Sequence, residues 1–158
     1  MTRKQFISYV EDFRETLRRF LVALCCGDTF LADEIAQETF VKAYLSLETF
    51  KDSSKFKAWI YRIAYNTFLN HKRNQRFPLS SDDIKELPAN DTSADPFKYE
   101  ELYMALNQLS SKERISILLY YMQGYSVKEI GRITGESDEN IRQHLSRGRK
   151  RLHDLIKS

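Results

Sequence analysis

The sequence predicts an all-α protein, with two helical modules joined by a flexible linker, and three observations support this. The 158 residues include only five glycines and three prolines, with 42% hydrophobic and 30% charged residues, a composition typical of ordered helical proteins. Apolar residues recur at spacings of three and four in the first 76 and the last 60 residues. All three prolines fall between Pro78 and Pro96, among Ser, Asp and Asn residues. We therefore divide the chain into residues 1–76, an acidic linker at 77–98 and residues 99–158.

Three helices are expected in the N-terminal module, each with one apolar face. The first carries its face from Phe6 to Leu24 and is ended by Gly27 and Asp28. The second runs from Leu31 to Leu47, and a polar turn at 51–54 separates it from a third at 56–75. We expect the second helix to bury Ile35, Phe40, Val41, Tyr44 and Leu45, and the third to bury Trp59, Ile60, Ile63, Ala64, Thr67 and Phe68.

Four helices are expected in the C-terminal module. The first has an apolar face from Tyr99 to Leu109, and the second starts at a capping box, Ser110 with Glu113 three residues later. Gly124 ends that second helix. The apolar residues of these two helices form the expected core of the module.

The sharpest local signal is the sequence of the last two helices, 126–145. Ser126 and Glu129 form another capping box, Gly135 occupies the turn where a left-handed residue is needed, and Ser137 can cap the following helix. Apolar residues at Ile130 and Ile141, with their neighbours at helical spacing, would dock the two helices on each other. This spacing is typical of a DNA-binding helix-turn-helix.

The exposed face of the last helix would then carry cationic and amide side chains. Arg can bind guanine through two hydrogen bonds and Gln can bind adenine in the same way, while further cations bind phosphates. The simpler alternative is an αα-hairpin with a solvated basic face. The residues predicted to contact duplex DNA are Ser137, Arg142, Gln143, Ser146, Arg147, Arg149 and Lys150.

Charge is unevenly distributed along the chain, although its net value is only +3. Residues 51–76 hold seven basic residues and one acidic residue, and 139–151 hold five basic residues and one acidic residue. Between them, 77–101 hold seven acids and two lysines. Two separate sites for a polyanion fit this pattern, whereas solvated helix faces are the alternative.

Other function classes receive little support from the sequence. No long apolar segment predicts a membrane span, and the N-terminus does not resemble a signal peptide. Cys25 and Cys26 are the only cysteines, and adjacent cysteines favour reduced thiols in a helix core over a disulfide, a metal site or a redox switch. No phosphate-binding loop or nucleophile–base pair is present. We therefore expect a cytoplasmic protein that is not an enzyme and has no cofactor or metal.

Two parts of the sequence independently resemble the sigma-70 family, in its extracytoplasmic-function (ECF) group. The segments 32–44 and 56–66 resemble regions 2.2 and 2.3–2.4 of these RNA polymerase sigma factors. The segments 109–114 and 125–149 resemble regions 4.1 and 4.2. The resemblance covers all but the linker and implies a sigma-2 helical bundle followed by a sigma-4 helix-turn-helix domain. Glu139-Asn140 and Gly148 depart from the family pattern.

The resemblance also implies partners and residue roles. Region 2.2 would dock on the clamp helices of the largest subunit of core RNA polymerase, region 4 would contact the flap and the minus-35 duplex, and regions 2.3–2.4 would melt the minus-10 element. The predicted polymerase-binding residues are Asp33, Glu34, Gln37, Glu38 and Lys42. The predicted minus-10 residues are Lys55, Phe56, Lys57, Arg62, Asn66, Asn70, Lys72 and Arg73.

An anti-sigma factor is a further partner that the resemblance implies. The acidic linker would pass toward the polymerase cleft, or would be a solvated spacer. The main alternative function is a conventional helix-turn-helix regulator that binds promoter DNA without docking on polymerase.

Overall fold

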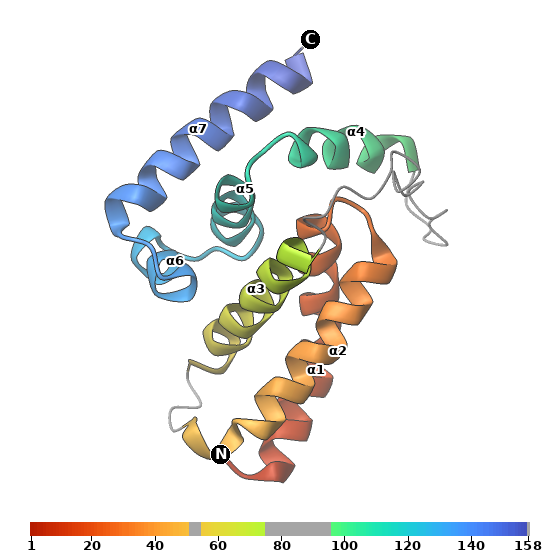
Figure 1. The fold of residues 1–158 in the computed structure, drawn as a ribbon, viewed down its shortest axis with the longest axis vertical. Helices are drawn as coiled ribbons and strands as arrows, with labels where there is room; N and C mark the ends of the chain where they lie inside the picture. The colour runs from red at the N-terminus through yellow and green to blue at the C-terminus, as the bar shows by residue number, and fades with distance from the viewer. Residues whose placement is uncertain (51–54, 75–95, 158) are drawn as a thin grey trace.

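The computed structural model describes residues 1–50, 55–74 and 96–157, and the regular structure in these ranges is helical (Figure 1). This confirms the predicted fold class. Residues 77–95 of the predicted linker lie outside the described ranges, and α4 begins at Pro96, three residues before the boundary drawn from the sequence. The elements are α1 (Arg3–Leu24), α2 (Thr29–Leu45), η1 (Leu47–Thr49), α3 (Phe56–Asn74), α4 (Pro96–Asn107), α5 (Ser111–Ile117), the π-helical turn η4 (Leu118–Met122), α6 (Val127–Thr134) and α7 (Asp138–Lys157).

The N-terminal half is a bundle of α1, α2 and α3. A capping box between Thr2 and Gln5 starts α1. Its end is a tight turn in which Cys26 (φ 56°) and Gly27 (φ 92°) adopt left-handed backbone angles, and the Asp28 carboxylate then accepts a hydrogen bond from the Leu31 amide to start α2. Glycine adopts such angles at little cost, whereas a side chain makes them unfavourable. The turn therefore lets α2 fold back along α1 (Figure 1).

The inward face of α2 differs from the stripe predicted from the sequence. Val41 and Leu45 are 58% and 76% exposed, and Tyr44 is also exposed, so these three assignments were wrong. Leu31 and the small residues Ala32, Thr39 and Ala43 take their place in the core, and the small side chains let α2 approach α1 and α3 closely. The buried residues of α2 are Leu31, Ala32, Ile35, Thr39 and Ala43.

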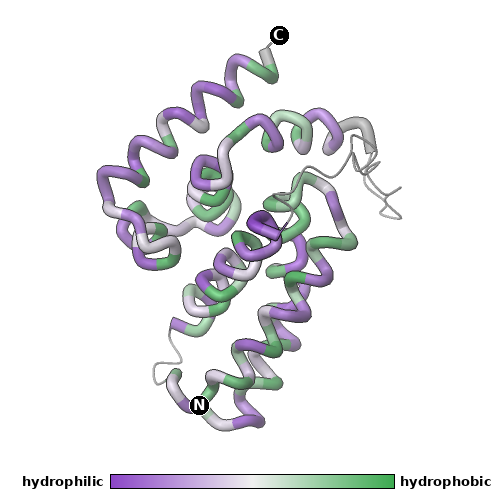
Figure 2. The backbone as a smooth tube through the Cα atoms, viewed as in Figure 1, coloured by the Kyte–Doolittle hydropathy of each residue, from purple (hydrophilic) through white to green (hydrophobic). Residues whose placement is uncertain are grey.

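The C-terminal half is built around α7, which packs against α4, α5 and α6. Capping boxes start α5 at Ser110 and α6 at Ser126, as predicted. Gly148 explains how closely α5 and α7 cross, because a Cβ built on it would stand 2.8 Å from the Ile117 Cγ1 atom. Hydrophilic positions dominate α7, with apolar positions recurring toward its neighbours (Figure 2).

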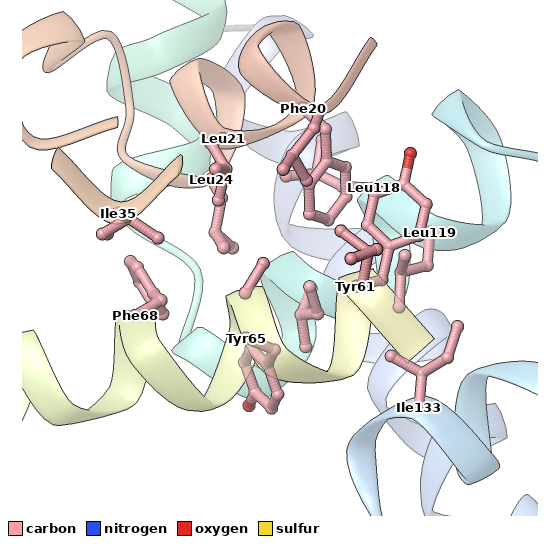
Figure 3. Packing of buried hydrophobic residues seen from close by; sticks show 14 of the residues in the cluster. Phe20, Leu21, Leu24, Ile35, Tyr61, Tyr65, Phe68, Leu118, Leu119 and Ile133 are labelled. Atoms are coloured by element: carbon pink, nitrogen blue, oxygen red, sulfur yellow. The ribbon is translucent and has the colours of Figure 1, made fainter. Parts of the chain in front are cut away.

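The two halves pack against each other through one continuous hydrophobic cluster. Figure 3 shows α1 and α3 side chains, including Phe20 and Tyr61, meeting Leu118 and Leu119 from η4 and Ile133 from α6. The sequence predicted two modules connected by a flexible linker and did not indicate that the modules pack against each other. This contact between the N-terminal and C-terminal halves is called the joint below. The surfaces considered below therefore lie on two halves that are in contact in the structure.

Candidate nucleic-acid interface

The turn between α6 and α7 has the geometry that a helix-turn-helix requires. Gly135 has φ 80°, in the left-handed region. A Cβ on Gly131 would lie 2.7 Å from the Glu136 carbonyl oxygen, so only glycine fits this crossing. Ser137 accepts a 3.1 Å hydrogen bond from the Asn140 amide and caps α7. The core that fixes the angle between the helices consists of Ile130, Ile133, Ile141 and Leu145, all buried.

A polar junction, rather than an apolar contact, closes this turn. The Glu136 carboxylate lies 2.9 Å from the Lys112 ammonium and accepts a 3.0 Å hydrogen bond from the Asn140 amide group. These hydrogen bonds, from Lys112 first and Asn140 second, lower the pKa of Glu136. The junction shows how the turn accommodates Asn140, which departs from the family pattern, and it ties the start of α7 to α5.

Every side chain predicted to contact the minus-35 duplex is exposed along α7. The set is Ser137, Arg142, Gln143, Ser146, Arg147, Arg149 and Lys150. Arg149 differs from the others because its guanidinium donates a 3.0 Å hydrogen bond to the Tyr121 hydroxyl of η4. That bond holds Arg149 at the flank of the face, a position suited to a phosphate contact.

A second polar and cationic face runs along α3. Lys55, Arg62, Asn66, Asn70 and Arg73 are exposed, and their spacings of seven, four, four and three residues place them on one side of a helix. The Arg73 guanidinium donates a 2.8 Å hydrogen bond to the Asn70 side-chain oxygen. The structure therefore brings five of the eight predicted minus-10 residues together.

The other three predicted minus-10 residues lie elsewhere. Phe56 is 2% exposed, and its ring packs among the aromatic side chains of α1 and Phe50, so the DNA contact predicted for it does not fit this position. Lys57 lies over the Phe13 ring, 5.9 Å from its centroid, and Lys72 lies over Phe68 at 5.7 Å. Both lysines remain exposed, but they flank the α3 face rather than belong to it.

A cleft of about 310 Å³ lies where the α3 face meets α6. Trp59 stacks on Phe50 in its wall, with ring centroids 4.3 Å apart and planes 10° apart. This contact agrees with the expectation that Trp59 packs inward. The cleft is lined by Phe50, Lys55, Ala58, Trp59, Arg62, Glu129, Arg132 and Ile133.

The α2 surface combines the predicted polar residues with exposed apolar residues that the sequence analysis missed. Phe30, Val41 and Leu45 are 71%, 58% and 76% exposed, and they share the outward side of α2 with Glu34 and Gln37 at helical spacing. Exposed large apolar side chains gathered on one helix face are typical of a protein-binding surface. The sequence analysis missed them because small residues, such as Ala32 and Ala43, are the ones buried on the opposite side.

The other three predicted polymerase-binding residues are tied to neighbouring helices. Asp33 accepts a 2.8 Å hydrogen bond from Arg18, and the Lys42 ammonium lies 3.0 Å from the Thr67 hydroxyl oxygen. Glu38 lies 3.0 Å from His71 Nε2. These contacts fix the rims of the α2 surface, on which Glu34 and Gln37 are exposed.

Cys25 and Cys26 are buried free thiols, as predicted. Burial, with the nearby Asp28 carboxylate as a second cause, raises the pKa of Cys25 to about 12. Thiolate is the reactive form of cysteine, so this environment disfavours redox chemistry. Within residues 1–50, 55–74 and 96–157, no group of three or more His, Cys, Asp or Glu side chains could hold a metal ion.

The fold and its two cationic helical faces are those of a DNA-binding transcription protein with two modules. Residues 9–77 match the family model for Sigma-70 region 2, and residues 99–152 match the model for Sigma-70, region 4. The chain is 31% identical over 142 residues to the ECF RNA polymerase sigma factor SigM of Bacillus subtilis, a match covering 87% of this chain and 86% of SigM. The chain belongs to the ECF RNA polymerase sigma factors of the sigma-70 family.

Two further comparisons agree with this assignment. The RNA polymerase sigma factor SigV of Bacillus subtilis is 29% identical over 149 residues, covering 94% of this chain and 89% of SigV. The solved structure of the sigma factor RpoE from Bartonella quintana, in complex with the anti-sigma factor NepR, has a TM-score of 0.81. That likeness covers 98% of each chain at 28% sequence identity. Among the helices described for this chain, none has the length and apolar character that crossing a bilayer requires.

Proposed function

We propose that this chain binds core RNA polymerase in the cytoplasm and directs promoter-specific initiation by contacting the minus-10 and minus-35 elements. The observation that carries the proposal is the presence, in one family member, of two separate cationic helical faces on the matched regions 2 and 4. Its role is to bind and to open DNA rather than to catalyse a reaction. The free energy of polymerase docking and strand capture would offset the cost of unstacking a few bases.

The minus-35 contact is assigned to α7. A helix-turn-helix inserts its second helix into the major groove, and the tight geometry at Gly131 and Gly135, which fixes how α7 crosses α6, supports this role for α7. Arg142, Gln143 and Arg147 are the candidates for base contacts because their side chains can bind base edges. Arg149 and Lys150 are the candidates for phosphate contacts.

The minus-10 contact is assigned to the α3 face. Capture of an unpaired strand needs cations for phosphates and polar side chains for base edges. Asn66 and Asn70 supply amides in the middle of this face, and Lys55, Arg62 and Arg73 supply positive charge around them. Lys57 and Lys72 would act at its margins, by attracting the strand rather than by touching bases.

Polymerase docking is assigned to the outward surface of α2. Glu34 and Gln37 would contact basic and polar groups of the clamp helices, while Phe30, Val41 and Leu45 would supply the apolar area that stabilises a protein interface. Asp33, Glu38 and Lys42 would mainly shape the surface through their contacts with Arg18, His71 and Thr67. The flap contact of region 4 remains a family expectation.

Regulation by an anti-sigma factor is part of the proposal. The solved structure with a TM-score of 0.81 is a sigma factor held by such a protein. The same arrangement of regions 2 and 4 in this chain would give an anti-sigma factor access to both halves at once.

Run-off transcription with purified core polymerase tests the proposed function directly. We expect promoter-specific transcripts only when the chain and core polymerase are both present. A folded chain that fails to program any promoter in a genomic template library would contradict the proposal. A duplex footprint that is as strong without polymerase as with it would instead favour the conventional regulator.

A further inference from the structure

Three carboxylates stand at the turn that leads into α7, and the structure places them differently. Glu136 is directed to α5, where its carboxylate lies 2.9 Å from the Lys112 ammonium. Asp138 is directed to α6, since its Oδ1 atom lies 3.5 Å from the position that a Cβ on Gly131 would occupy. Glu139, the second residue of α7, is exposed, and no hydrogen bond or ion pair within the described part of the chain involves its carboxylate. Glu139 is therefore available to bind a ligand.

Glu139 lies on the same side of α7 as the residues assigned to the minus-35 duplex. Exposed residues that follow one another at spacings of three and four share one side of a helix. On α7 these residues are Glu139, Arg142, Gln143, Ser146, Arg147 and Lys150. The first residues of a recognition helix contact base edges, and Glu139 is the first residue of this set. A duplex bound along these residues would therefore place its bases near the Glu139 carboxylate.

A carboxylate is an unusual group on a surface that binds DNA, because phosphate groups repel it. It accepts hydrogen bonds and does not donate them. In the major groove, cytosine presents an amino donor, adenine presents a donor beside an acceptor, and guanine and thymine present acceptors. A carboxylate thus finds its best partner in cytosine and is repelled by guanine and thymine. At position 139 it would contribute discrimination between bases rather than affinity.

We propose that Glu139 is a specificity-determining residue, which selects a C·G pair in the minus-35 element by accepting a hydrogen bond from the cytosine N4 amino group. The inference rests on the proposed minus-35 role of α7 and extends it by naming a base. A helix rises about 1.5 Å per residue, so Glu139 stands about 5 Å along α7 from Arg142 and Gln143. Successive base pairs are about 3.4 Å apart. The cytosine should therefore lie about one or two base pairs from the pair that Arg142 or Gln143 contacts.

A purely structural role for Glu139 predicts a different result. Acidic residues in the first turn of a helix interact favourably with the helix dipole, and Asp138 and Glu139 both lie in the first turn of α7. If that charge alone mattered, replacing either carboxylate by its amide would change the binding of every duplex alike. A base contact instead makes the preference for one base depend on Glu139. Asp138→Asn is the matched control, because it removes the same charge from the same turn on the side directed to α6.

Selection from a promoter library with a randomised minus-35 element, by core polymerase carrying the full-length chain, tests the inference. We expect the wild type to enrich a C·G pair at one position. Glu139→Gln should reduce the preference for that pair about tenfold and favour A·T in its place, because glutamine binds adenine. The preferences at neighbouring positions should persist. Asp138→Asn should retain the wild-type pattern. Titration of two duplexes that differ only at the selected pair then measures the change in preference directly.

Three results would overturn the role of Glu139. The wild type could select a minus-35 sequence without a C·G pair, the C·G preference could persist in Glu139→Gln, or Asp138→Asn could abolish that preference equally. Each of these results leaves the proposed function standing, since the chain and polymerase would still select a minus-35 sequence. A wild-type complex that selects no sequence from the library would contradict the proposed function, and the role of Glu139 with it.

Discussion

Gly148 of α7 lies directly against Ile117 of α5, so closely that a methyl group on Gly148 would stand 2.8 Å from the Cγ1 and 3.2 Å from the Cδ1 of Ile117. Gly148→Ala would gain about 1 kcal/mol of helix propensity but would force the stiff, branched isoleucine to move. Overpacking of this kind costs about 1 to 3 kcal/mol. We expect a net loss of about 1 kcal/mol in the free energy of unfolding, measured by urea denaturation.

The same substitution in an Ile117→Ala background provides the control. Removing Cγ1 and Cδ1 leaves space for the new methyl group, so Gly148→Ala should now stabilise the chain by about 1 kcal/mol. A change of the same sign and size in both backgrounds would show that the contact with Ile117 does not matter.

Arg114 should be among the most sensitive positions for stability. Arg114→Met preserves much of the apolar stem but removes the donors to the carbonyl oxygens of Leu24, Leu106 and Leu109. Leaving buried carbonyl groups without partners costs about 3 kcal/mol in total. Arg142→Met, at an exposed position, is the control and should change the unfolding free energy by less than about 0.5 kcal/mol. Equal effects of the two substitutions would refute this role for Arg114.

Local patterns were enough to predict the all-α fold, the order of the helices and the helix-turn-helix. Capping boxes such as Ser126 with Glu129, and a turn glycine such as Gly135, act within a few residues, so the sequence displays them directly. The inward face of α2 was not predictable in this way. Its core positions are small residues such as Ala32 and Ala43, and only their tertiary neighbours decide that Val41 and Leu45 face outward.

The candidate site residues also divide into those that local spacing predicts and those whose position depends on tertiary contacts. The exposure of the predicted α7 residues could be expected from the sequence, because all of them except Ser137, which caps the helix, lie on one regular helix. Phe56 was misassigned because its burial depends on rings supplied by α1 and Phe50. The joint through Arg114 and Leu24 links residues 90 positions apart, and no local spacing encodes a contact of that kind.

The two cysteines should be slow to react in the folded chain. Burial raises the pKa of Cys25 to about 12 and raises that of Cys26 as well, so neither supplies appreciable thiolate at pH 8. We expect alkylation by iodoacetamide at least about 100-fold slower than in the urea-unfolded chain. Mass spectrometry after timed quenching measures the rate. A folded wild type that labels as fast as the unfolded chain would contradict the burial of the two thiols.

The exposed apolar residues of α2 should contribute to polymerase affinity. Val41→Ser and Leu45→Ser together should weaken binding to core polymerase about tenfold or more, while leaving duplex binding by α7 unchanged. Competition against a labelled sigma factor for core polymerase measures the affinity. Met104→Ser is the matched control, since Met104 is 61% exposed on α4 and lies away from the α2 surface. If Met104→Ser weakened the affinity for core polymerase equally, the loss would not be specific to the α2 surface.

The roles assigned along α7 predict that substitutions at base-contacting and phosphate-contacting residues change DNA binding in different ways. Arg142→Ala and Arg147→Ala should each weaken promoter use through the minus-35 element by about 1 to 3 kcal/mol and relax the preference for its sequence, while polymerase binding persists. Lys150→Ala, at a phosphate-contacting position, should instead weaken binding to all duplexes alike and reduce the slope of log affinity against log salt by about one unit. Titrations of duplex at several salt concentrations, beside a polymerase-binding assay, distinguish these outcomes. If Arg142→Ala and Arg147→Ala reduced polymerase binding as much as minus-35 use, α7 would have to serve as a polymerase contact, and its assignment as the groove-reading helix would be wrong.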